Sequence, residues 1–267
     1  MLKILFESKK ANSHPIQVMF IGIFYSTLSI FLGSWIFPQY SSLIIVFFTV
    51  LPCVYLIQSS IKIEETKDKN YIKETHALKS HSKVVKTLLY LFIGFVISFT
   101  FWTFILPLEK TNLLFDLQLQ VIEGIRTSTV TGNFLKSDML ELIISNNLKV
   151  LLVSLIISLF YSAGAIFVIA WNASVMGVVI GTLLKNTSLI YLPVATVKYF
   201  LHGIPEMLSY ITIVLAGGIL YTSIIKGDIL KEQKTKRILI DTITLIGISI
   251  LLIFLAGIIE VYISALI

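Results

Sequence analysis

Long apolar segments without charge are the feature that most constrains this chain. A helix needs about 20 apolar residues to cross the hydrocarbon core of a bilayer. The 267-residue sequence is 56% hydrophobic and only 13% charged, whereas soluble domains average about 25% charged residues. The sequence therefore predicts an all-α, polytopic membrane protein. Segments that meet the length requirement are residues 16–37, 41–61, 84–107, 148–171, 205–225 and 238–261.

The stretch 173–202 is ambiguous. The polar residues 185–188 divide it into two apolar halves, each about 20 Å long at 1.5 Å per residue. It could form one broken, tilted crossing or a re-entrant hairpin. The first alternative gives about seven membrane-crossing helices, one of them broken.

The distribution of basic residues distinguishes these alternatives. The linker 62–86 carries seven lysines, and the loop 226–237 carries five basic residues. Cytoplasmic loops are enriched in lysine and arginine, and a single crossing through 173–202 places both segments on the cytoplasmic side. We therefore expect a multi-pass protein of the cell membrane with a cytoplasmic N-terminus and an extracytoplasmic C-terminus.

Three regions follow from this topology. Residues 1–61 form an N-terminal transmembrane hairpin, residues 62–85 a cytoplasmic basic linker, and residues 86–267 the main membrane domain. Between the third and fourth crossings, apolar residues recur at helical spacing opposite charged ones, which predicts an extracytoplasmic amphipathic helix. Its apolar face consists of Leu114, Leu117, Val121 and Ile125.

The sharpest polar pattern is Lys198, His202 and Glu206, spaced i, i+4 and i+8. Gly203 and Pro205 suit a helix end and a helix start, so we expect a turn at His202-Gly203-x-x-Glu206. The charged residues would then lie where the helix dipoles stabilise them. The functional alternative is that His202 and Glu206 bind an ion, a lipid headgroup or a proton.

Other polar and small residues interrupt the apolar runs. Asn172 is expected to cap the broken helix. Glu260 lies at the outer end of the last span, either at the interface or paired with Lys198 or Lys149. Gly177 and Gly181 form a small-xxx-small ridge, used for packing within the chain or as a homodimer face.

Taken in order, these features resemble the stage II sporulation protein M family over roughly residues 86–267. Individual positions depart from the family pattern at Ala173, Leu201 and Ala265. The resemblance implies a membrane scaffold and does not imply sporulation. The motifs that carry it are Asn146-Asn147, Asn172, Gly177-x-x-x-Gly181, His202-Gly203-x-x-Glu206, and Gly257 with Glu260-x-Tyr262.

Sequence motifs for catalysis are missing: there is no Walker P-loop, no G-x-G-x-x-G, no nucleophile elbow and no H-E-x-x-H. We therefore expect no enzyme activity, cofactor or metal site, and the net charge of +6 indicates loops that face anionic lipid rather than nucleic acid. The leading expectation is a scaffold or anchor for envelope-remodelling partners. The alternative is a transporter, channel or lipid-handling protein with a polar site at the broken helix and the His202–Glu206 turn.

Overall fold

The computed structural model describes residues 15–68, 82–130, 136–160, 165–187, 189–225 and 232–264, and these residues contain no strand. Most of the predicted 62–85 linker and part of the basic loop, 226–231, lie outside them. The elements are α3 (Pro15–Ile36), η1 (Pro38–Tyr40), α4 (Ser41–Asp68), α6 (Ser82–Ile105), α7 (Leu108–Leu114), α8 (Asp116–Val130), α9 (Lys136–Phe160), α10 (Ala165–Asn186), η2 (Leu189–Tyr191), α11 (Leu192–Ile225), α12 (Glu232–Ile258) and η4 (Ile259–Ile263).

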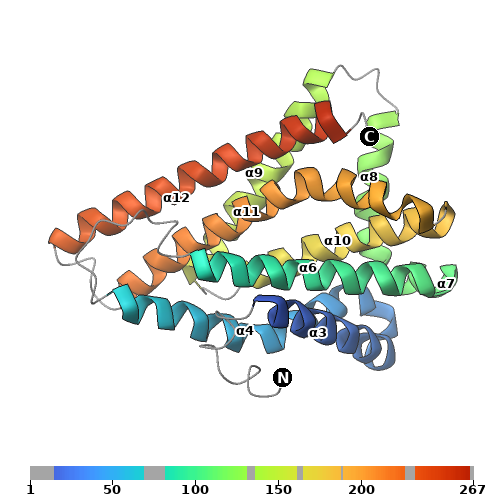
Figure 1. Ribbon diagram of the computed structural model, residues 1–267, viewed down its shortest axis with the longest axis horizontal. Coiled ribbons are helices and arrows are strands. Elements are labelled where there is room, and N and C mark those ends of the chain that lie inside the picture. Colours follow the sequence, from blue (N-terminus) through green and yellow to red (C-terminus); the bar gives the residue numbers. More distant parts are fainter. Residues whose placement is uncertain are drawn as a thin grey trace.

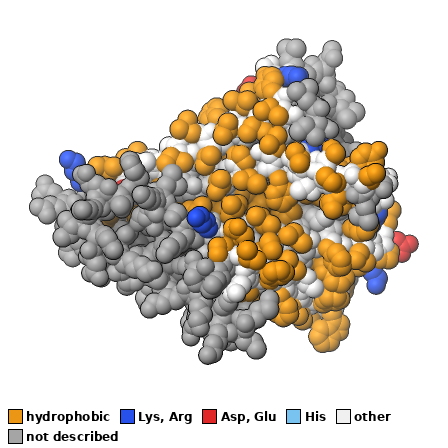
Figure 2. All heavy atoms as spheres, in the orientation of Figure 1, with side chains coloured by type: hydrophobic (Ala, Val, Ile, Leu, Met, Phe, Trp, Pro, Cys, Tyr) orange, Lys and Arg blue, Asp and Glu red, His pale blue; other side chains and the backbone are white. Residues whose placement is uncertain are grey.

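Six of these helices, α3, α6, α9, α10, α11 and α12, are long and apolar enough to cross a membrane, and α4 adds a shorter apolar stretch, Pro38–Val54. Large hydrophobic side chains remain on the outside, such as Trp35, which is 80% exposed, and Leu251, which is 70% exposed. Figure 2 shows such side chains spread over much of the described surface. The prediction of an all-α polytopic membrane protein is confirmed.

The boundaries predicted between residues 148 and 202 are wrong. The expected crossing 148–171 is replaced by α9, which ends at Phe160, and by α10, which starts at Ala165. The chain contains no charge between Lys149 and Lys185, so hydropathy alone gives no boundary there. The polar residues 185–187 therefore do not interrupt a crossing, because α10 ends at Asn186 and α11 begins at Leu192.

The predicted turn at His202–Glu206 is also wrong. Helix α11 runs through Gly203 and Pro205 to Ile225, a length of 34 residues. A proline inside a helix removes one backbone hydrogen bond, and membrane helices tolerate this where neighbouring helices support the backbone. Gly203 faces such a neighbour, since a Cβ atom there would meet the Met176 side chain of α10.

The helices pack in two groups (Figure 1). Helices α3, α4, α6 and α10 form one group, and α9, α11 and α12 form the other; α11 joins them by packing against α10 and α6. Gly177 and Gly181 allow α10 to approach α6 closely, because a Cβ atom would lie 2.5 Å from Phe99 Cβ at the first position and 2.6 Å from Thr103 Cβ at the second. This ridge therefore packs within the chain.

The predicted amphipathic helix forms as α8, which lies across one end of the bundle (Figure 1). Its buried face differs from the expected one, since Leu117 and Val121 are 38% and 40% exposed while Gln118 is fully buried. The Gln118 Nε2 atom donates to Ser174 Oγ of α10 at 3.1 Å and to the Ser42 carbonyl oxygen of α4 at 3.4 Å. This polar anchor orients α8.

We predict that Gly181→Ala destabilises the protein by about 1–3 kcal/mol, because an added methyl group overpacks the contact with α6. Gly247→Ala is the matched control, since nothing lies within 4 Å of a Cβ atom there and alanine favours helix by about 1 kcal/mol. Thermal unfolding in detergent measures both. Equal shifts in the two variants would contradict the packing role of Gly181.

Candidate functional site

Three predicted residues and Tyr210 share one face of α11 because the helix is continuous. Lys198, His202, Glu206 and Tyr210 follow one another at intervals of four residues, so their side chains are neighbours along the helix. The Tyr210 hydroxyl donates to Glu206 Oε1 at 3.0 Å, and Tyr210 is fully buried. Glu206 is thus held by Tyr210, which sequence analysis did not single out. The spacing of four residues between them is visible in the sequence.

The C-terminal end of the last span supplies the other half of this cluster. Helix α12 passes into the π-helical turn η4, which carries Glu260, and Ser264 follows. The Ser264 hydroxyl lies 3.1 Å from His202 Nδ1. Glu260 lies close enough to Glu206 and Tyr210 for its charge to act on both. Single π-helical turns are rare and frequently occur at functional sites.

This cluster places two carboxylates near each other inside the bundle. Among the described residues, neither Glu206 nor Glu260 forms an ion pair, so the alternative in which Glu260 pairs with Lys198 or Lys149 is not formed. His202 bonds to Ser264 rather than to Glu206. Repulsion between like charges is strong in a medium of low dielectric constant, so these two carboxylates are candidates for binding a proton or a cation.

The two predicted asparagines lie elsewhere. Asn147 is in the middle of α9 and is 7% exposed. Asn172 is inside α10, where its Nδ2 atom donates to the Val168 carbonyl oxygen at 2.8 Å. The expectation that Asn172 caps a helix is wrong, because α10 begins at Ala165.

A second polar region lies on α9, and sequence analysis named Asn146 and Lys149 in it without recognising that they share one side of a helix. One side of this helix is buried against its neighbours, including Leu151, which is 5% exposed. The opposite side is exposed and carries Glu141, Ser145, Asn146 and Lys149; we call these four residues the α9 stripe. Lys149 lies eleven residues before the end of α9, about 17 Å along the axis, and therefore near the middle of this helix.

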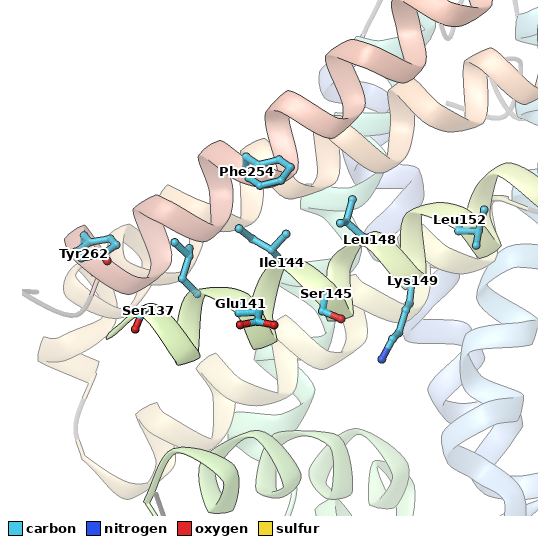
Figure 3. Close-up of a pocket in the computed structure, with 10 residues that line it drawn as sticks. Ser137, Glu141, Ile144, Ser145, Leu148, Lys149, Leu152, Phe254 and Tyr262 are labelled. Carbon is cyan, nitrogen blue, oxygen red and sulfur yellow. The ribbon is translucent and has the colours of Figure 1, made fainter. Parts of the chain in front are cut away.

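Three residues of the α9 stripe, Glu141, Ser145 and Lys149, border a groove of about 660 Å³ between α9 and the α12–η4 segment. Figure 3 shows Ile144, Leu148 and Phe254 between the two helices, whereas Glu141, Ser145 and Lys149 point away from α12. The Lys136 ammonium group lies 5.4 Å from the centre of the Tyr262 ring and bridges α9 and η4 at one end of the groove. The i, i+4, i+8 spacing of Glu141, Ser145 and Lys149 was visible in the sequence, but placing the span at 148–171 left Glu141 and Ser145 outside the membrane.

Comparison with known proteins identifies the family. The model of the family described as "Stage II sporulation protein M" matches residues 82–265, and the chain belongs to this family, as the sequence motifs predicted. The match begins at the first residue of α6, so α3 and α4 lie outside it. Neither a curated protein nor a solved structure matches the chain significantly.

Proposed function

We propose that this member of the stage II sporulation protein M family is a membrane scaffold or anchor that holds another membrane protein, of the envelope-remodelling kind, on the open side of α9. The supporting observation is the α9 stripe. A lysine at the bilayer centre costs about 3 kcal/mol on insertion scales, and Lys149 is exposed on a crossing helix. A partner helix would shield it from lipid.

The exposed side of α9 has the composition expected of a helix–helix interface. Beyond Lys149 it becomes apolar, with Leu152, Val153 and Ile156 between 46% and 58% exposed. A helix lying along the whole side would contact polar groups in one half and pack against apolar side chains in the other. Within the chain, the opposite side of α9 is already used, since Ser158 packs against Gly217 of α11.

A position-specific cross-linker tests the scaffold. With a photoactivatable residue at Ser145, we expect protein adducts in native membranes, because the partner covers this side of α9. Leu251 of α12 is the matched control, since it is 70% exposed but lies on an apolar surface that needs no partner. The scaffold proposal is wrong if position 145 gives no protein adducts or if both positions give the same ones.

A second candidate function is transport of protons or cations, and the pair Glu206–Glu260 beside the π-helical turn favours it. Proteoliposomes containing the wild type should then show a flux that falls at least about tenfold in Glu206→Gln, because polar groups inside a membrane mark ion pathways. Glu109→Gln on α7, an exposed position, is the control. Equal flux in all three proteins would remove the pair from any transport mechanism.

We also propose that the N-terminus is cytoplasmic and the C-terminus extracytoplasmic. In Figure 1 the end of α4, the start of α6, the end of α11 and the start of α12 lie at the same end of the bundle. The two lysine-rich linkers therefore begin and end on one side, which the positive-inside rule assigns to the cytoplasm.

Thiol labelling of intact cells tests this orientation. In a Cys53→Ala background, Lys110→Cys on α7 should react with a membrane-impermeant reagent and Lys236→Cys on α12 should not, because both positions are exposed but lie at opposite ends of the bundle. The unmodified chain is a suitable blank, since Cys53 is fully buried. Labelling of Lys236→Cys alone would reverse the orientation.

A further inference from the structure

We infer that the partner on the α9 stripe is a transmembrane helix of a different protein, which carries a cationic side chain at the level of Glu141 and a carboxylate at the level of Lys149. This inference rests on the proposed scaffold function and specifies the chemistry of its partner.

The charges on α9 cannot satisfy each other. Glu141 and Lys149 are eight residues apart on one side of the helix, about 12 Å along its axis, whereas an ion pair requires about 4 Å. Neither forms a hydrogen bond or an ion pair within the described part of the chain, Lys149 is exposed, and in Figure 3 its side chain extends away from α9. Two opposite charges at the same spacing on a neighbouring helix would pair with both.

A second copy of this chain fits the stripe poorly. Two copies with the same orientation in one membrane are related by an axis along the membrane normal, so equivalent residues of a symmetric interface lie at equal depth. Glu141 would face Glu141 and Lys149 would face Lys149, and both contacts would be repulsive. An antiparallel pairing would match the charges but would require the two copies to cross the membrane in opposite directions.

Lipid also fits the stripe poorly. An anionic headgroup could pair with a lysine near the interface, but Lys149 lies about 17 Å from the nearer end of α9, and Glu141 on the same side would repel the headgroup. Acyl chains offer no partner to either charge. A transmembrane helix can place polar side chains at this depth at a lower free-energy cost than a lipid headgroup can, because the backbone hydrogen bonds of the helix are already made.

Two designed leucine–alanine transmembrane peptides test the inference. The matched peptide carries arginine at the level of Glu141 and glutamate at the level of Lys149, and the exchanged peptide carries the same two residues in swapped positions. Energy transfer between labelled peptide and labelled full-length protein in liposomes reports binding. We expect the matched peptide to bind about tenfold more tightly, because polar contacts between membrane helices are individually modest.

Charge reversal in the protein provides the decisive comparison. The double variant Glu141→Lys/Lys149→Glu should prefer the exchanged peptide, and such a reversal would itself show that the variant is folded. Glu141→Gln and Lys149→Gln should each reduce the preference. The double variant Glu109→Lys/Lys110→Glu makes the same exchange at exposed positions of α7 and should keep the wild-type preference.

Equal binding of the two peptides to the wild type, or an unchanged preference in the charge-reversed protein, would overturn the inference. So would energy transfer between two labelled copies of the wild type that is lost in Lys149→Gln, because a second copy would then occupy the stripe. If adducts at Ser145 persist in native membranes despite one of these results, the scaffold stands and only the chemistry of its partner is wrong. If the adducts are absent as well, both proposals fail.

Discussion

Close approach of helices at glycine is the interaction on which the architecture depends. In lipid there is no hydrophobic force between apolar helices, so packing requires small residues that let backbones meet. Gly94 of α6 faces the Met19 carbonyl of α3, Gly181 of α10 faces Thr103 of α6, and Gly217 of α11 faces Ser158 of α9. Gly257 of α12 lies against Ile144 of α9 in the same way. These contacts hold each helix group together, and they fix where the polar residues lie.

The continuity of α11 determines the buried polar cluster. A turn at Gly203 would have separated His202 from Glu206, whereas the unbroken helix aligns both with Tyr210. Because α11 packs against η4, His202 meets Ser264, which follows the π-helical turn, and Glu206 and Tyr210 face the segment that carries Glu260. Gly203 lies against the Met176 side chain of α10, so this glycine contacts a neighbouring helix and does not end its own.

Much of the fold could be predicted from the sequence, because apolar length determines membrane crossings and motif order identified the family. Boundaries between residues 148 and 202 could not, since small and apolar residues continue there without a charge. The buried side of α8 was mispredicted because a pattern of apolar residues gives no sign that the polar Gln118 is fully buried. For the candidate sites, the spacing of Lys198, His202 and Glu206 was readable, but their partners Tyr210 and Ser264 depend on tertiary contacts.

The two candidate sites are physically connected through η4. Glu260 belongs to the buried cluster, whereas Tyr262, two residues later, lines the groove beside α9 and contacts Lys136. A displacement of η4 would therefore change both the carboxylate pair and the groove, and substitutions in this turn cannot separate a scaffold from a transporter. Substitutions on α9 can separate them, because Glu141 and Lys149 border the groove without a hydrogen bond or ion pair to any described residue of the cluster. The distinction between the two functions thus depends on α9, the helix whose position in the membrane the sequence predicted least well.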